Sequence, residues 1–395
     1  MLNSIKKAIL TLLASSFSLT SVFCQLTSDP AAYVQLVNEI RDLIPENGQD
    51  RTDFVGAAIR LAWHDASSYR SATNDGGVDG CINFEDPDNN GLEDIHATLT
   101  DLHTSYTTLL TQADIFQLAA QVATVESFAD NGAAADILDT FLVGRPDNIA
   151  DGCSNDARQP SPHSDFAAIE ALMGAGGIGF STREIVVLMG AHSVGRAQTQ
   201  NSGFDGEWDN SPNVLDNQFY DDLVNDPWNP NLNDDEHLQY DFRGRIMLHT
   251  DMALAFEVED YSTTGLPADT STVCGNFPNG RGGGGGRGRR LQRGVRGGNN
   301  GGNRGGNNGG NGGGNNGGGN NGGNGGGNNG GGNNGGNGGQ CAASAQASIV
   351  QEFINDGPGW QAEFAAAMVN LSYKGPFAVD DLTSACGDLG DCVSG

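Results

Sequence analysis

The stretch AAIRLAWHDAS, residues 57–67, places an arginine, a tryptophan and a histidine close together among apolar residues. Residues three and four apart share one face of an α-helix, so Arg60, Trp63 and His64 project in the same direction while Ile59 and Ala62 lie elsewhere. A guanidinium stays charged, whereas an imidazole exchanges protons near neutral pH. The stretch therefore predicts a helix of which one face carries both charge and proton chemistry.

The first 24 residues are typical of a secretory signal peptide. Lys6 and Lys7 precede an apolar run and then small residues, with cleavage expected near Cys24. A buried N-terminal helix is the alternative interpretation. No later stretch approaches the ~18 uninterrupted apolar residues that a membrane span needs. We therefore expect the mature protein to be secreted and to have no membrane span.

The composition limits the partners of the chain. A formal net charge of -29 argues against nucleic acid or anionic membrane and favours a cationic partner or a small neutral substrate. Loss of Cys24 would leave six of the seven cysteines, an even number that favours disulfides in an oxidising compartment. None has the CxxC spacing of a zinc site. The six are Cys81, Cys153, Cys274, Cys341, Cys386 and Cys392.

Residues 279–340 form a tract of Gly and Asn with an arginine-rich start. The tract has too few apolar side chains to offset the entropy of ordering, so we expect a disordered insertion. Its arginines could contact a polyanion, or Arg289-Arg290 could be a processing site; a solvated insertion without a partner is the alternative. A helical pattern follows the tract. We therefore expect one domain, made of residues 25–278 and completed by a C-terminal helix and tail, residues 341–395.

Helical periodicity dominates the rest of the chain and predicts an all-α fold. Apolar residues recur at spacings of three and four over residues 29–44, 53–67, 91–106, 111–127, 164–176, 181–196, 246–260 and 345–373. Ser181 with Glu184 three residues later predicts a capping box at one helix start. Only short pieces such as TFLVGR, residues 140–145, could be strands.

A second informative stretch begins with IVVLMGAHSVGR, residues 185–196, which ends an apolar helix on His192. A lone histidine there is more often a core residue than a ligand. Here, however, two apolar helices each carry a histidine, one with a nearby arginine and the other followed by many side-chain oxygens. This combination favours a ligand over a core histidine. A neutral imidazole is a common ligand of haem iron, and a second, unligated histidine can serve as acid and base on the opposite face.

These motifs resemble those of the plant, fungal and bacterial haem peroxidase superfamily. RLAWHD (60–65) is similar to its distal motif, AHSVG (191–195) to its proximal motif, NNGLEDI (89–95) to the segment with the distal asparagine, and MLHTDMAL (247–254) to that with the proximal aspartate. The four motifs occur in the family's order, between Ala31 and about Cys386. The resemblance implies a two-lobed fold with haem b between distal and proximal helices, interrupted by the Gly/Asn tract.

On the distal side, the resemblance implies roles for four residues, two of which act directly on hydrogen peroxide. His64 would take a proton from peroxide and return it to the departing oxygen, while Arg60 would stabilise the developing negative charge. Asn89 would accept the outer N–H of His64 and so fix its tautomer. Trp63 would lie over the porphyrin. A turn asparagine is the alternative interpretation of Asn89.

On the proximal side, the resemblance implies that His192 is the axial iron ligand and that Asp251 accepts its outer N–H. Trp208, sixteen residues after His192, is similar to a proximal tryptophan that can share the oxidising equivalent as a radical. Pro160 and Pro162 would line the haem edge. A solvated aspartate and ordinary loop prolines are the alternative interpretations.

The resemblance also implies a proximal cation site of hard oxygens. Its two carboxylates would favour Ca²⁺ over K⁺, because a doubly charged ion compensates both. An acidic Asn/Pro loop is the alternative. The matching ligands are Ser193, Asp209, Ser211, the Val214 carbonyl and Asp216.

A distal Ca²⁺ site is implied by three further matches, Asp65, the Gly77 carbonyl and Asp79. Cys81 stands where the secreted enzymes have a serine, and a thiol is a poor Ca²⁺ ligand. If Cys81 forms a disulfide, that ligand is absent. Cys274 and Cys386 are similar to a pair that joins the C-terminal region of the fungal secreted enzymes.

The branch of the superfamily and the donor stay open. Trp63 and Trp208 match the branch of ascorbate and cytochrome c peroxidases, whereas the signal peptide and cysteines match secreted enzymes. Asn201 stands where ascorbate peroxidases have a substrate-binding arginine. A manganese site needs three carboxylates, but the matching residues are Asp53, Ala57 and Gln198, of which only one is acidic. Val187 stands where lignin-oxidising enzymes have an exposed tryptophan. These departures favour small phenolic or aromatic donors.

The activity expected from the resemblance is reduction of hydrogen peroxide to water, with one-electron oxidation of donors through a ferryl intermediate, by a monomer. A redox protein such as cytochrome c is the alternative donor. A non-enzymatic extracellular matrix protein that uses the Gly/Asn tract is the alternative from another class. A metal-dependent hydrolase is not supported, because the sequence contains no HExxH-like spacing of histidines.

Overall fold

The computed structural model describes residues 30–129, 136–148, 153, 159–268, 270, 273, 341–378 and 383–385. All of them belong to one compact unit, residues 1–281 together with 338–395. The predicted signal peptide and the Gly/Asn tract lie outside the described residues. So do Cys274, Cys386 and Cys392, and with them the expected Cys274–Cys386 pair.

The described residues are mainly helical, as predicted. The longer helices are α2 (Pro30–Leu43), α3 (Gly48–Ala66), α4 (Glu93–His103), α5 (Gln112–Ser127), α7 (Phe166–Met173), α8 (Thr182–Met189), α10 (Gln218–Asn225), α11 (His249–Ala255), α13 (Ala347–Asn355) and α14 (Gly357–Leu371). Shorter ones are η1 (Pro87–Asn89), α6 (Asp136–Asp139), η4 (Gly190–Ser193), α9 (Thr199–Ser202) and α12 (Tyr261–Thr264). The capping box predicted at Ser181 and Glu184 is present at the start of α8 and is thus confirmed.

The strands depart in part from the all-helical prediction. β1 (Leu142–Val143) falls within residues 140–145, the short piece that could be strand, and pairs antiparallel with β5 (Thr383–Ser384). An antiparallel sheet of β2 (Asn229–Leu232), β3 (Leu238–Phe242) and β4 (Arg245–Leu248) was not expected. Arg243 and Gly244 both have positive φ, 54° and 86°, which is the backbone of a tight hairpin turn. The helix expected from residue 246 therefore begins only at His249.

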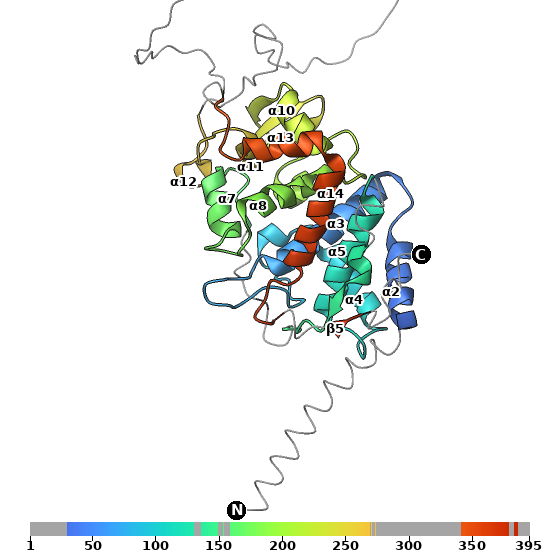
Figure 1. Ribbon diagram of the computed structural model, residues 1–395. Coiled ribbons are helices and arrows are strands. Elements are labelled where there is room, and N and C mark those ends of the chain that lie inside the picture. Colours follow the sequence, from blue (N-terminus) through green and yellow to red (C-terminus); the bar gives the residue numbers. More distant parts are fainter. Residues whose placement is uncertain are drawn as a thin grey trace, which may run out of the picture. The chain divides into compact units, whose positions relative to one another are not determined.

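The final predicted helix is also divided in two. It breaks at Asp356, whose side chain accepts a hydrogen bond from the Gly359 N–H and caps α14, with a proline in its first turn. α14 packs against both α5 and α8. In Figure 1 it crosses in front, between the group α2, α3, α4 and α5 and the group α7, α8, α10, α11 and α13.

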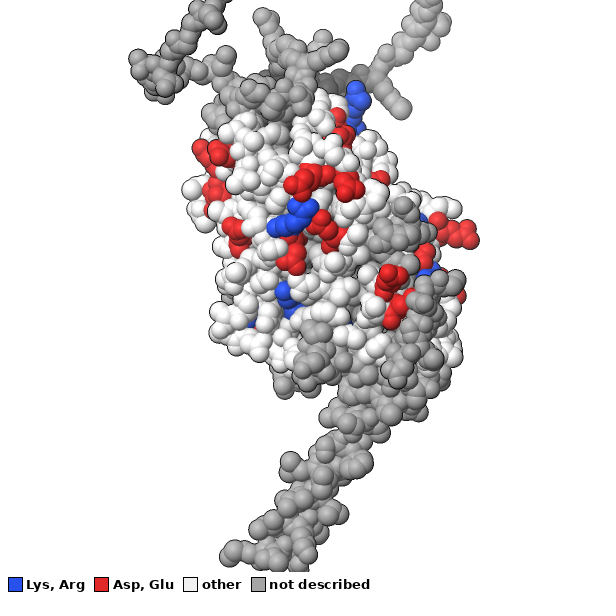
Figure 2. Space-filling model, viewed as in Figure 1, with Lys and Arg blue, Asp and Glu red and all other residues white. Residues whose placement is uncertain are grey.

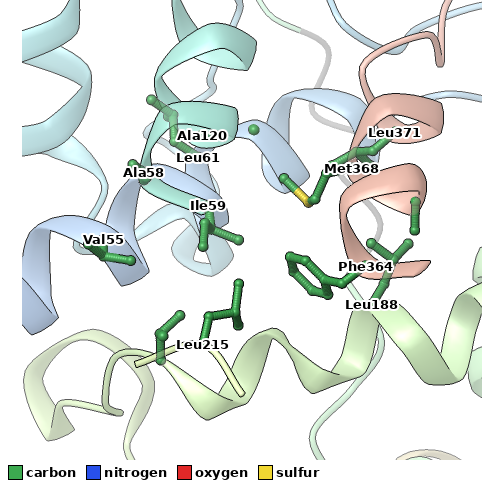
Figure 3. Close-up of a cluster of buried hydrophobic side chains, with 14 of the residues drawn as sticks. Val55, Ala58, Ile59, Leu61, Ala120, Leu188, Leu215, Phe364, Met368 and Leu371 are labelled. Atoms are coloured by element: carbon green, nitrogen blue, oxygen red, sulfur yellow. The ribbon is translucent and has the colours of Figure 1, made fainter. Parts of the chain in front are cut away.

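The core lies where these two groups meet α14. Figure 3 shows Val55 and Ile59 of α3 facing Leu215, with Phe364 and Met368 of α14 beside them. All five side chains are almost completely buried. Burial of this apolar surface holds the chemistry-bearing face of α3 at a fixed place in the molecule.

One close backbone approach positions the two histidine-bearing segments. A Cβ atom on Gly56 in α3 would lie 2.9 Å from the Cα of Gly195, so only glycine fits there. Gly56 is one helical turn before Arg60, and Gly195 follows His192 by three residues. An ion pair between Arg196 Nε and Asp53 Oδ1, at 3.2 Å, joins the same two segments. The segment that carries His64 therefore lies against the one that carries His192.

Candidate active site

The distal group consists of Arg60 and His64 on α3 and Asn89 at the end of η1. His64 Nδ1 lies 2.6 Å from Asn89 Oδ1, and Arg60 Nε donates to His64 Nε2 at 3.2 Å. The Asn89 amide is oriented by its own Nδ2–H, which donates to the Asn83 carbonyl at 2.8 Å. Three residues that were predicted together therefore form one hydrogen-bonded chain.

These bonds determine the tautomer of His64. Because the Asn89 oxygen can only accept, His64 Nδ1 carries the proton, and Nε2 presents a lone pair toward Arg60. Burial, together with the nearby Arg60 charge, lowers the His64 pKa to about 3, and the hydrogen bond to Asn89 opposes this shift. His64 is thus a neutral imidazole whose Nε2 is unprotonated, as a general base requires.

Arg60 is held by backbone carbonyls as well as by His64. Its guanidinium donates to the Asn90 carbonyl at 2.9 Å and to the Asp88 carbonyl at 2.6 Å. Burial lowers the Arg60 pKa, and the carboxylates of Asp88 and Glu93 raise it. A guanidinium remains charged under such a shift, so the site combines one positive charge with one neutral base.

Trp63 has a partner that sequence reasoning missed. Its indole N–H donates to Gln159 Oε1, and Gln159 Nε2 donates to Ser67 Oγ at 2.7 Å. Its ring stacks on Phe180 with centroids 6.4 Å apart. Gln159 is a single residue in a loop nearly a hundred positions away, and nothing in its local pattern marks it.

The loop that carries Gln159 continues through Pro160 and Pro162, both partly buried. The Pro162 carbonyl accepts from the Thr250 N–H at 3.2 Å, which ties the loop to α11 beside Asp251. The loop therefore touches both the Trp63 side and the Asp251 side of the site.

The proximal group joins His192, Asp251 and Trp208 through one carboxylate. Asp251, which is fully buried, accepts from His192 Nδ1 at 2.8 Å, from Trp208 Nε1 at 2.8 Å and from the Leu248 N–H at 2.7 Å. The imidazole and the indole stack with centroids 4.3 Å apart. Asp251 is buried, which excludes the alternative interpretation of a solvated aspartate.

The donor set fits a haem iron. The acceptor at Nδ1 leaves the lone pair of His192 on Nε2, the nitrogen that an axial ligand uses, and a carboxylate behind the imidazole is the usual arrangement. The His192 side chain is 31% exposed although Asp251 behind it is fully buried. An imidazole with one nitrogen anchored and its other edge accessible is suited to a metal-bearing cofactor.

The residues of the predicted proximal cation pocket also lie together. Ser193 Oγ donates to Asp209 Oδ2 at 2.9 Å and contacts the Val214 carbonyl at 3.2 Å, and the Asp216 N–H donates to Ser193 Oγ. The Ser211 N–H donates to Asp209 Oδ1 at 2.8 Å. Burial raises the Asp209 pKa to about 7, with hydrogen bonds from Ser211 and Ser193 opposing the shift.

The predicted distal cation residues are arranged differently. The Asp79 and Gly80 N–H groups each donate to Asp65 Oδ1 at 3.0 Å, so this oxygen is already engaged, and burial raises the Asp65 pKa to about 8. The Gly77 carbonyl lies 3.5 Å from Ser68 Oγ. Cys81 forms a disulfide with Cys153 and has no thiol to offer. Among the described residues, no three His, Cys, Asp or Glu side chains converge as metal ligands.

Comparison with known proteins identifies the class to which this fold and site belong. A family model described as peroxidase matches residues 38–264, more than half of the chain. The chain therefore belongs to the peroxidase family, within the haem peroxidase superfamily that its motifs resemble.

Three relatives narrow the similarity to one branch, and all three are named cytochrome c peroxidase, mitochondrial. That of Emericella nidulans is 33% identical over 53% of this chain and 56% of its own length. Those of Candida glabrata and Candida albicans are 28% and 32% identical, each over 57% of this chain, and over 62% and 61% of their own lengths. The chain thus spans about three fifths of the length of these relatives.

The relatives contradict the predicted secretion of this protein, because they are named as mitochondrial. The expectation of a secreted, extracellular protein is wrong. It rested on lysines followed by an apolar run, but mitochondrial targeting segments are likewise basic, rich in serine and poor in acidic residues. The first 24 residues contain serines and no acidic residue. Separately, no helix among the described residues is long and apolar enough to cross a membrane.

Proposed function

We propose that the chain is a haem-dependent peroxidase that reduces hydrogen peroxide and oxidises a donor in one-electron steps. One observation carries the proposal: His64 is a buried neutral imidazole whose tautomer is set by Asn89 and whose basic nitrogen faces Arg60. A scaffold protein has no use for a general base prepared in this way. Haem, held by His192, would supply the iron at which the O–O bond is broken.

The distal residues would move one proton and balance one charge. His64 Nε2 would accept a proton from the first oxygen of hydrogen peroxide and return it to the second, so that water leaves. The Arg60 guanidinium, which already donates toward this nitrogen, would stabilise the negative charge that develops on the departing oxygen. Asn89 would keep Nδ1 protonated through the cycle, so that only Nε2 exchanges protons.

The proximal residues would orient and tune the ligand. The Asp251 carboxylate holds His192 Nδ1–H and gives the imidazole part of an imidazolate's basicity. Trp208 donates to the same carboxylate and stacks on the ligand, so an electron leaving the indole has a short path to the iron side. We infer that Trp208 is where an oxidising equivalent first enters the protein.

For the donor, we favour a small cationic redox protein over small phenols. The whole chain carries a net charge of -29, and acidic side chains are spread over the face in Figure 2, where basic ones are few. A negatively charged surface attracts cationic partners from a distance. The relatives' names are consistent with such a donor. Phenols and aromatic amines are the second candidate, through a haem edge beside Pro160 and Pro162.

A donor comparison at two ionic strengths separates these candidates. Steady-state rates with reduced cytochrome c, a phenol, Mn²⁺ and ascorbate are measured at low and high salt. We expect the highest rate with cytochrome c and a steep loss of that rate at high salt, because salt screens the attraction. A higher, salt-independent rate with the phenol would reverse the assignment.

We also propose that Ser193, Asp209, Ser211, the Val214 carbonyl and Asp216 bind one Ca²⁺. Their oxygens come from hydroxyl, carboxylate and carbonyl groups, which are the ligands that Ca²⁺ prefers. Calcium titration of chelated protein should raise its melting temperature, and Asp216→Asn should abolish most of that rise. An equal response in the variant would contradict the assignment. We propose no distal Ca²⁺ site, because Asp65 Oδ1 already accepts backbone hydrogen bonds and Cys81 is in a disulfide.

The absorption spectrum tests the central proposal. Purified protein reconstituted with haem should show the Soret band of a histidine-ligated ferric haem, and one equivalent of hydrogen peroxide should shift it. His192→Gln should bind haem more weakly or with an altered band. Failure of the wild-type chain to take up haem would overturn the proposal.

A further inference from the structure

A buried tyrosine and histidine, Tyr240 and His249, form a hydrogen-bonded pair that the proposed function does not use. The Tyr240 hydroxyl lies 3.0 Å from His249 Nδ1, and their rings stack with an interplanar angle of 16°. Tyr240 on β3 is 0% exposed and His249, the first residue of α11, is 1% exposed. The pair is therefore shielded from water.

The direction of this hydrogen bond follows from the other side of the imidazole. His249 Nε2 lies 2.7 Å from the Glu259 carbonyl oxygen, which can only accept, so Nε2 carries a proton. Burial lowers the His249 pKa, and the nearby carboxylates of Asp260, Asp165 and Glu259 oppose this. The imidazole is neutral, so Nδ1 has the lone pair and the Tyr240 O–H donates to it.

Tyr240 differs in this respect from two other buried tyrosines. Tyr33 donates its hydroxyl to the Leu138 carbonyl and Tyr220 donates to the Val186 carbonyl, both at 2.7 Å. A peptide carbonyl accepts a hydrogen bond but is too weak a base to take the proton. An imidazole can take it. Since a phenol becomes very acidic when it loses an electron, only Tyr240 of the three has a base ready to receive its proton.

A short bonded path connects the pair with the proximal site. Trp208 Nε1 and the Leu248 N–H both donate to Asp251 Oδ2, at 2.8 and 2.7 Å, and Leu248 is covalently joined to His249. The strands add a second connection. The Ile246 N–H donates to the Glu207 carbonyl at 2.9 Å, next to Trp208, and Tyr240 pairs with Met247 across β3 and β4.

We propose that Tyr240 is a second oxidisable site of this enzyme, with His249 as its proton acceptor. The proposal rests on the proposed function, which supplies the oxidant: Trp208 oxidised by one equivalent from hydrogen peroxide. Tyr240 gives one electron to oxidised Trp208, which returns to its resting state. The phenolic proton moves to His249 Nδ1, and the imidazolium that forms keeps its bond to the Glu259 carbonyl.

The cycle closes when an external donor returns an electron. Tyr240 then takes one electron from the donor and its proton back from His249. Tyr261 indicates where that electron enters, because its ring centroid lies 5.0 Å from that of His249 and Tyr261 itself is partly exposed. A phenolic or protein donor at Tyr261 could thus be oxidised without reaching the haem edge.

Electron paramagnetic resonance of the peroxide-treated holoenzyme tests this inference. Samples frozen within milliseconds of adding one equivalent of hydrogen peroxide are prepared from protein with ring-deuterated tyrosine and, separately, with deuterated tryptophan. We expect a component that narrows with labelled tyrosine, disappears in Tyr240→Phe and persists in Tyr220→Phe, the matched buried control. In deuterium oxide this component should form more slowly, because a proton moves with the electron.

His249→Asn gives a second, independent variant. Asparagine can accept the Tyr240 hydrogen bond but cannot take its proton, so the tyrosine component should be lost while the tryptophan component remains. A tyrosine signal unchanged in Tyr240→Phe or His249→Asn would overturn the inference. A tryptophan signal without any tyrosine component would overturn it too and leave the proposed function standing. The absence of haem uptake or of any peroxide-induced signal would overturn both.

Discussion

The substitution Asp251→Asn probes the proximal site because one carboxylate there receives three donors. His192 Nδ1 reaches Oδ1, while Trp208 Nε1 and the Leu248 N–H share Oδ2. An amide has one accepting oxygen and one donating nitrogen. The oxygen is better placed toward Trp208 and Leu248, where two donors meet, which leaves the NH₂ group facing His192.

His192 must then accept at Nδ1, so its proton moves to Nε2 and the lone pair needed by iron is no longer available. The variant loses one charge-assisted hydrogen bond, worth about 1.5–3 kcal/mol. At about 1.4 kcal/mol for each factor of ten, haem affinity should fall roughly 10- to 100-fold, which is the usual cost of removing the partner behind a metal-bound histidine.

Titration of the apoprotein with haem, followed at the Soret band, measures this loss. Trp208→Phe is the matched control, since it removes a donor from the same carboxylate but leaves the His192–Asp251 bond. Its haem affinity should stay within about threefold of wild type, as expected for loss of contacts that do not bear on the ligand. An Asp251→Asn variant that binds haem as tightly as the control would refute the tautomer argument.

Four further predictions concern the distal side and stability. His64→Ala should retain haem but react with hydrogen peroxide about 10²- to 10⁴-fold more slowly in stopped flow, the usual value of a general base; an unchanged rate would remove that role. In wild type the same rate constant should be level from neutral pH downward and fall with a midpoint near pH 3, where His64 becomes protonated. Because the folded pKa of His64 is about 3 and its ordinary value 6.5, the unfolded chain binds the proton first as pH falls. This group alone should lower stability by up to roughly 5 kcal/mol between pH 6.5 and 3, while Asp65 and Asp209, whose pKa values burial raises, act in the opposite direction. The difference in urea-unfolding free energy between wild type and His64→Ala should therefore change over this window, and a constant difference would contradict the burial of His64. Finally, replacing Cys81 and Cys153 by Ser opens a loop with a sequence separation of 72. Unfolding free energy should drop by about 4 kcal/mol, and a drop below about 1 kcal/mol would show that the disulfide contributes little.

Contacts within one element were predictable from the residues. Arg60 and His64 are one helical turn apart, so their meeting follows from helix geometry alone, and the Ser181 capping box is equally local. The pairing of His192 with Asp251 spans 59 positions and was expected from a family resemblance rather than from any pattern in the chain. Gln159 beside Trp63 was not expected on either ground.

The hairpin of β3 and β4 shows why some elements escaped prediction. Residues 246–248 are apolar and continue into a helical pattern, so periodicity alone assigns them to the helix. The turn at Arg243 and Gly244 instead commits them to a strand, and Tyr240 is thereby placed opposite Met247 and beside His249. Strand pairing joins residues that no local spacing relates.

A mainly helical domain, the faces of its helices and the residue types at its site could be predicted from the amino acids, because these features depend on neighbours within a few positions. The tertiary structure alone decided which donors share Asp251, which nitrogen of each histidine carries a proton and how far burial lowers the His64 pKa. Hydrogen-bond partners and desolvation come from segments brought together by folding. The stretch 57–67 thus supplied the groups, and the packing around it made His64 a base.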